Sequence, residues 1–265
     1  FIILHCLLAK IPVFICGRPG TSKTVSILIV KMLLELPTEK KAQSQIFSKL
    51  PEAVFDQLWG SKDTTADQVK SHFDRTRNIA NMYETARKSS KEPMPERLHI
   101  VYFEEMGVAD TNDKDPLKSL HPLLEPTESE QNEFESLCFI GVSNTVLDTS
   151  KMSRMLYIQR FDMEQLELKA TLKDYKIDDQ IKSKYPELIA EVSVEDCLVA
   201  AYIEFRQFEA RDSWHKEFYG PRDFYNMGKW INQNLPLLVK SLGENSFNKR
   251  EVVVQYFILA IERNF

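Results

Sequence analysis

The sequence lacks the closely spaced cysteines of metal-binding or disulfide-rich domains. Its four cysteines are scattered along 265 residues, and no two of them form a C-x-x-C pair: Cys6, Cys16, Cys138 and Cys197. Cys16 and Cys138 fall inside short apolar runs that resemble buried strands. This scatter favours reduced thiols in a protein core over a disulfide framework, so we expect a cytoplasmic protein.

A strong excess of charge is also missing. The formal net charge is −5 and the isoelectric point is about 5.7, so bulk charge does not attract nucleic acid or an anionic membrane. The apolar segment 1–16 is interrupted by Lys10 and Pro12 and is too short to cross a bilayer. It also lacks the small-residue cleavage site of a signal peptide. The sequence therefore predicts neither a nucleic-acid partner nor a membrane span.

What is present is the composition of a soluble globular protein, with 43% hydrophobic and 28% charged residues. A chain of 265 residues is long enough for one large domain or for one domain with an appendage. Because the chain begins with Phe1 and ends in a helix-like run at Phe265, we expect it to be a segment of a longer protein.

The strongest functional signal is a predicted strand, loop and helix near the start of the chain. Residues 13–16 are a short apolar run of β-formers, residues 17–24 turn sharply, and residues 25–36 are largely apolar with helical length. A strand, a glycine-bearing loop and a helix in this order form the context of a phosphate-binding loop. The loop consists of Gly17, Arg18, Pro19, Gly20, Thr21, Ser22, Lys23 and Thr24.

The residue types of this loop suit phosphate chemistry. Gly17 and Gly20 allow backbone N–H groups to converge on phosphate oxygens, and the helix N-terminus adds a positive dipole end. We expect Lys23 to reach the β- and γ-phosphates and the Thr24 hydroxyl to ligate Mg²⁺. Ser22 replaces the second glycine of the usual pattern, and it fits if the backbone there does not need a positive φ. The alternative is an ordinary strand, turn and helix with a lysine at its start.

The rest of the chain divides into two parts. Strand-like runs occur at residues 53–59, 98–103, 137–142 and 155–159, with helical patterns at 1–9, 65–88, 116–124 (interrupted or restarted at Pro122) and 147–154. This β-α alternation predicts a parallel sheet covered by helices. Later segments show helical periodicity alone: 163–172, 194–210, 222–230 and 250–263. We therefore predict an α/β nucleotide-binding subdomain over 1–162 and an all-helical lid over 163–265.

Two acids follow the strand predicted at 98–103. In an ATPase site, Glu104 would hold Mg²⁺ through its water shell, and Glu105 would orient and polarise the attacking water. Glu104 is one methylene longer than the usual aspartate. Alternatively, the strand merely ends at the surface in charged residues.

An amide follows the strand predicted at 137–142, which we expect to lie between the other two motif-bearing strands. There, Asn144 would hydrogen-bond the γ-phosphate or the attacking water. Its alternative role is that of a turn residue.

Taken together, these residues resemble the AAA+ ATPases, and within them the AAA+ units of the mysterin family of giant RING-finger ubiquitin ligases. The resemblance covers nearly the whole chain, and the histidine-centred segment 116–125 is its most specific part. It rests on residues 17–24, 105–109, 116–125, 140–144, 147–148, 151–154, 222–225 and 263–265. It implies a P-loop NTPase fold with a C-terminal helical lid, with ATP and Mg²⁺ as cofactors.

The resemblance also implies roles for residues that the motifs alone do not assign. Asn144 would be the sensor on the central sheet, and Arg222 the second sensor, closing from the lid over the γ-phosphate. Arg154 stands where such proteins carry an arginine finger for the nucleotide of a neighbouring unit. Its alternative role is a cation that complements a helix C-terminus, and Arg160 is a weaker alternative finger. Neighbouring AAA+ units are the implied partners, and no RING cysteine–histidine pattern is present, so ligase chemistry is not expected in this segment.

Two functional hypotheses follow. The first is a working ATPase unit whose hydrolysis moves the lid against the α/β part, and Glu105 and Asn144 favour it. The second is an inert unit that holds ATP to stiffen a ring of similar units, and Glu104 in place of aspartate favours it. A small-molecule kinase is a third possibility, but it gives no reason for the paired acids, Asn144, Arg154 and a helical lid to occur together.

Overall fold

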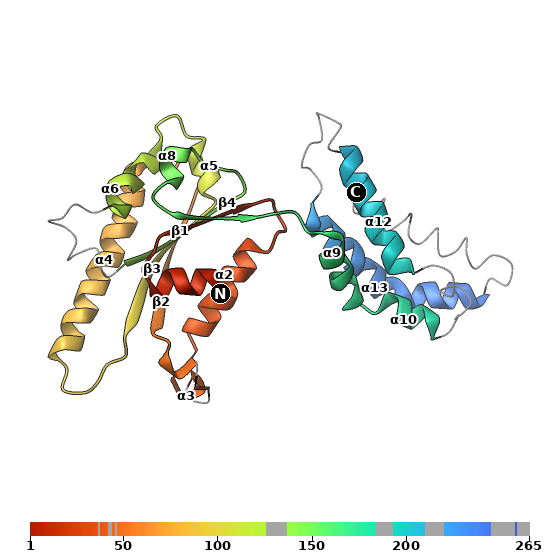
Figure 1. Cartoon of the computed structure of the whole chain (residues 1–265), viewed down its shortest axis with the longest axis horizontal. Helices are drawn as coiled ribbons and strands as arrows, with labels where there is room; N and C mark the ends of the chain where they lie inside the picture. Colours follow the sequence, from red (N-terminus) through yellow and green to blue (C-terminus); the bar gives the residue numbers. More distant parts are fainter. Residues whose placement is uncertain are drawn as a thin grey trace. The chain divides into compact units, whose positions relative to one another are not determined.

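The computed structural model describes residues 1–36, 38–41, 44–45, 47–125, 137–183, 193–209, 220–244 and 258 (Figure 1). The chain divides into two compact units, which we describe separately. The first comprises Phe1–Arg18 and Ser22–Phe161, and the second comprises Pro19–Thr21 and Asp162–Phe265.

Five parallel strands form the sheet of the first unit, in the order β2-β3-β4-β1-β5. The strands are β1 (Val13–Gly17), β2 (Glu52–Trp59), β3 (Arg97–Glu104), β4 (Leu137–Ser143) and β5 (Leu156–Arg160). This parallel sheet confirms the predicted α/β fold class. The three central strands are buried along nearly their whole length, which explains their continuous apolar sequences. Because all five strands run in one direction, their carboxyl ends meet at one edge.

Helices pack into a separate hydrophobic core on each face of this sheet (Figure 1). Neighbouring residues of β3 alternate between the two cores, since successive strand side chains point to opposite faces. On one face lie α1 (Ile2–Leu8) and α2 (Lys23–Leu34), and on the other lie α4 (Ala66–Ser89), α5 (Met106–Asp110), η2 (Pro116–Ser119) and α6 (Leu120–Leu124). The other short elements of this unit are α3 (Thr38–Lys41), η1 (Phe47–Lys49) and α8 (Thr149–Met152).

The sequence of α4 is mainly polar, and the helix is stabilised by an N-terminal capping box and by a narrow apolar stripe along one face. Thr65 and Gln68 make a capping box, in which the Thr65 hydroxyl accepts the Gln68 N–H and the Gln68 side chain accepts the Thr65 N–H. The buried residues Val69, Phe73 and Ala80 lie on one helical face, and Phe73 stacks on Phe139 of β4. Burying a side chain of that size stabilises the fold by about 1.5–3 kcal/mol.

Several elements differ from the sequence prediction. The helix predicted at 147–154 covers only α8, and α5 was not predicted. α2 begins at Lys23 rather than at residue 25, so the lysine itself lies in the first helical turn. The break expected at Pro122 lies earlier, where η2 ends at Ser119 and α6 begins at Leu120. Pro122 occupies the first turn of α6, and its missing N–H costs no helical hydrogen bond there.

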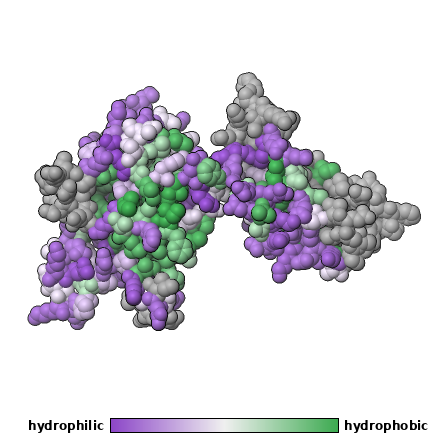
Figure 2. All heavy atoms as spheres, viewed as in Figure 1, coloured by the Kyte–Doolittle hydropathy of each residue, from purple (hydrophilic) through white to green (hydrophobic). Residues whose placement is uncertain are grey.

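An apolar face of α2 is exposed. Val25, Leu28, Ile29 and Met32 follow helical spacing along one side, and each is at least half exposed. Apolar surface gathers over this part of the first unit in the space-filling view (Figure 2). A contiguous patch of this kind is typical of a surface that packs against another protein surface.

The second unit is helical in its described part. Its helices are α9 (Gln165–Lys173), α10 (Ile177–Lys182), α12 (Val194–Glu209) and α13 (Pro221–Glu244). A single core joins them, in which the rings of Tyr202 and Phe224 lie 4.8 Å apart. Asp178 of α10 caps α12, since its Oδ1 accepts the backbone N–H groups of Val194 (2.9 Å) and Glu195 (3.2 Å).

This unit departs from the prediction in two places, and one predicted helix is not tested. The short helix α10 was not predicted, and α13 extends well beyond the expected 222–230. The helix predicted over 250–263 lies outside the described residues except for residue 258. No helix in the described part of the chain combines the length and hydropathy that crossing a bilayer requires.

Candidate functional site

The candidate site lies at the carboxyl edge of the sheet, where β1, β4 and β3 are neighbours. β1 leads into the phosphate-binding loop, β3 ends at Glu104, and β4 ends one residue before Asn144. Its position confirms that β4 lies between the other two motif-bearing strands. Residues separated by more than 100 positions in the sequence therefore meet at this edge.

Two residues of the loop have left-handed backbone conformations. Gly20 has φ +86°, which glycine adopts without a steric penalty. Ser22, the N-cap of α2, has φ 60° and ψ 24°. Serine was expected to fit if the backbone at this position did not need a positive φ. That condition is not met, because Ser22 has a positive φ. A residue with a Cβ pays roughly 1–2 kcal/mol in this conformation.

Lys23 is buried in the loop that precedes it. Its ammonium nitrogen donates hydrogen bonds to the carbonyl oxygens of Gly17 (2.6 Å) and Arg18 (2.8 Å). Only 6% of Lys23 is exposed, and a buried cation requires acceptors of this kind. The predicted phosphate-binding cation is thus held by two carbonyl groups of the loop.

The predicted Mg²⁺ ligands lie side by side. The Thr24 hydroxyl donates to Oε1 of Glu104 at 3.0 Å, and Glu104 is buried. A hydroxyl and a carboxylate oxygen suit Mg²⁺, which takes few protein ligands and completes its shell with phosphate oxygens and water. Among the described residues, no cluster of three or more His, Cys, Asp or Glu side chains is placed to hold a metal ion.

Glu105 and Asn144 also meet. The Asn144 side-chain amide donates to the Glu105 carboxylate, at 3.1 Å to Oε2 and 3.4 Å to Oε1. Glu105 has φ 56° and is the N-cap of α5, so the chain turns sharply between the two acids. This turn separates them: Glu104 contacts Thr24, whereas Glu105 contacts the predicted sensor.

Two glycines permit this close packing. The Gly60 N–H donates to the Glu104 carbonyl at 2.8 Å, and a Cβ on Gly60 would overlap the Glu105 carbonyl. A Cβ on Gly107 would overlap the hydroxyls of Ser143 and Thr145, on either side of the sensor. A glycine directly after a predicted strand, as at Gly60, can indicate that another backbone segment approaches closely.

Two further side chains beside Glu104 were missed. The Gln57 amide donates to Oε2 of Glu104 at 2.9 Å. The Tyr102 hydroxyl is buried and makes no hydrogen bond within the described residues. Burial and the neighbouring Glu104 carboxylate raise the pKa of the Tyr102 phenol, so the hydroxyl stays protonated and uncharged.

Arg154 makes contacts within its own unit. Its Nε donates to Oε2 of Glu125 at 2.8 Å, and a terminal nitrogen donates to the Ser150 carbonyl at 2.6 Å. The second contact lies at the end of α8, where a cation complements the helix dipole. Arg160 is the exposed last residue of β5, and Arg222 is an exposed residue in the first turn of α13 in the second unit. The finger and second-sensor roles remain predictions.

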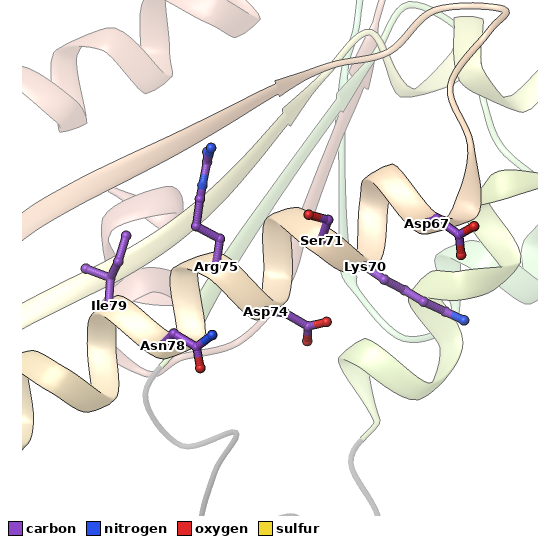
Figure 3. Close-up of a pocket in the computed structure, with 7 residues that line it drawn as sticks. All are labelled: Asp67, Lys70, Ser71, Asp74, Arg75, Asn78 and Ile79. Carbon is purple, nitrogen blue, oxygen red and sulfur yellow. The ribbon is translucent and has the colours of Figure 1, made fainter.

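A separate hollow lies on the outer face of α4 (Figure 3). All seven of its lining residues come from this one helix: Asp67, Lys70, Ser71, Asp74, Arg75, Asn78 and Ile79. None of the predicted site residues lines it. We therefore place the candidate site at the sheet edge.

The sheet order, the loop after β1 and the polar residues at the ends of β3 and β4 define a P-loop NTPase fold of the AAA class. The chain belongs to the RNF213 AAA domain family, whose family model matches residues 1–167. This confirms the resemblance to the AAA+ units of mysterin, another name for RNF213.

Curated relatives match most or all of the chain. It is 28% identical to the E3 ubiquitin-protein ligase RNF213 of Homo sapiens over 87% of its length, and 26% identical to that of Mus musculus over 100%. It is 25% identical to the E3 ubiquitin-protein ligase rnf213-beta of Danio rerio over 87% of its length. The chain spans only 4–5% of the length of these relatives. It therefore corresponds to one AAA unit of a much larger protein.

Proposed function

We propose that this AAA unit binds Mg·ATP at the sheet edge and hydrolyses it. The observation that carries the proposal is the meeting of Lys23, the Thr24–Glu104 pair and the Glu105–Asn144 pair at the ends of three adjacent strands. Phosphoryl transfer depends mainly on positioning and on electrostatic stabilisation, and these groups supply both.

Each group has one part in the proposed reaction. The backbone N–H groups of residues 17–22, except at Pro19, which has none, cradle the phosphates. Lys23 exchanges its carbonyl partners for phosphate oxygens. Thr24 and Glu104 hold Mg²⁺, which neutralises phosphate charge when bound. Glu105 polarises the attacking water, and Asn144 orients the Glu105 carboxylate and senses the γ-phosphate.

We further propose that hydrolysis drives or stabilises conformational change in a ring of AAA+ units of a mysterin-like protein in the cytoplasm. The exposed apolar face of α2 supports packing against neighbouring units. Arg154 supplies the arginine finger to a neighbour, and Arg222 closes from the helical lid. The relatives named as ubiquitin ligases support a ligase context for the whole protein.

An inert, ATP-holding structural unit is the second candidate. Glu104 in place of the usual aspartate favours it. The longer side chain has one more rotatable bond, so its carboxylate would hold the metal in a less defined position. The left-handed Ser22 is a second departure from the usual loop.

Titration with ATP, ADP and AMP tests nucleotide binding directly. We expect calorimetry in the presence of Mg²⁺ to show that ATP and ADP bind and that AMP binds at least about tenfold more weakly. AMP lacks the β-phosphate that Lys23 contacts, and a charge-assisted hydrogen bond contributes about 1.5–3 kcal/mol. Equal affinities for ATP and AMP, or no binding of any of the three, would contradict the proposal.

A further inference from the structure

Glu104 is held by two neighbours, and only one of them belongs to a recognised motif. Thr24 donates to Oε1 at 3.0 Å, and Gln57 donates to Oε2 at 2.9 Å. Gln57 lies on β2, 47 positions before Glu104, and the two residues sit on adjacent parallel strands. Each carboxylate oxygen therefore has its own donor from a different element.

The register of the sheet explains how Gln57 reaches the acid. Gln57 pairs with Tyr102, and Glu104 follows two residues later on the same face of β3. Phe55, two residues before Gln57, packs into the core beneath α2. The Gln57 amide thus comes from the α2 side of the sheet, where Thr24 also lies.

The longer acid creates a need for this second donor. Compared with aspartate, glutamate has an additional rotatable bond, so its carboxylate can reach more positions. A donor on each oxygen fixes both the position and the plane of the carboxylate. A neutral amide also leaves the negative charge available for a cation, whereas an arginine or lysine at position 57 would compete with a metal.

We propose that Gln57 is a positioning residue that orients the Glu104 carboxylate, which together with the Thr24 hydroxyl would hold the Mg²⁺ of the bound nucleotide. This inference rests on the proposed function of the site. Groups that orient metal ligands from behind typically contribute 10–100-fold to metal affinity. Gln57 thereby compensates for the departure of Glu104 from the usual aspartate.

Gln57→Leu tests this role, because leucine has a similar size and no hydrogen-bonding group. ATP affinity is measured by calorimetry on the chain in excess EDTA and then across a series of free Mg²⁺ concentrations. We expect Gln57→Leu to leave ATP affinity in EDTA unchanged and to raise the half-saturating Mg²⁺ concentration by roughly tenfold. A purely structural role for Gln57 would not shift the Mg²⁺ dependence alone.

The matched control is Gln159→Leu, at an exposed glutamine on β5 of the same sheet, which should behave like the parent. Gln57→Asn is measured in the same way in case the leucine variant does not fold, since it keeps an amide that is too short to reach Glu104. An unchanged Mg²⁺ dependence in the folded variant overturns the role of Gln57 and leaves the proposed function intact. If the parent binds no ATP in either condition, the proposed function itself fails.

Discussion

Replacing Glu105 with glutamine is expected to leave ATP bound and to reduce its hydrolysis by about 10²–10⁴-fold. Glutamine keeps the shape of the side chain, and its oxygen can still accept the Asn144 amide that now lies 3.1 Å from Oε2. It loses the negative charge that polarises the attacking water, and a positioned acid–base group contributes rate factors of this size. The measurement is phosphate release together with ATP affinity, for parent and variant.

The control for this substitution is Glu96→Gln, which removes the same charge directly before the first residue of β3, at the end of the strand far from the site. This variant should hydrolyse ATP like the parent. Both variants are measured in the assembled protein, because the proposed arginine finger, Arg154, would act there on a neighbouring unit. If Glu105→Gln hydrolyses ATP at the measurable rate of the parent, the catalytic role is wrong. Equal and very slow rates in parent and variant would favour the inert structural unit.

Arg154→Ala is expected to lower ATP hydrolysis by roughly 10³-fold in the assembled protein. An arginine finger that stabilises transition-state charge has effects of this size in related phosphoryl-transfer sites. To act on a neighbour, the guanidinium must leave Glu125, to which it is now hydrogen-bonded at 2.8 Å. In the isolated chain we expect slow hydrolysis and little further loss on substitution.

Arg160→Ala is the matched comparison, since Arg160 is the alternative finger. A large loss for Arg160→Ala and none for Arg154→Ala would reassign the finger. If Arg154 only complements the end of α8, its replacement should lower the thermal stability and not the rate. Rapid turnover by a demonstrated monomer, independent of protein concentration, would also exclude a finger supplied in trans.

Much of the first unit was predictable because its sequence pattern is local. The buried strands β1, β3 and β4 are continuous apolar runs, and the helical segments between strands imply parallel crossovers. The sheet then brings polar residues at strand ends to one edge, so Thr24 meets Glu104 and Glu105 meets Asn144. Motif order along the chain predicted that these residues share one edge, whereas the hydrogen bond between Asn144 and Glu105 was not predicted.

Other features depend on contacts that no local pattern encodes. Gln57 is one polar residue in a half-buried edge strand, and only the register of β2 against β3 places it beside Glu104. Gly60 has the sequence of a turn, yet its function in the fold is to let the Glu105 backbone approach. Ser22 has a positive φ, which its residue type disfavours, because the path of the surrounding loop requires this backbone conformation.

Calorimetric titration of ATP into the parent, Lys23→Ala and Lys31→Ala tests the central claim that this loop binds nucleotide phosphate. Lys31 lies on the same helix, is partly exposed and pairs with Glu35 at 3.8 Å, so its replacement removes the same charge away from the loop. We predict a loss of roughly tenfold or more for Lys23→Ala, corresponding to about 1.5–3 kcal/mol, and parental affinity for Lys31→Ala. Equal ATP affinity for the parent and Lys23→Ala would contradict the account.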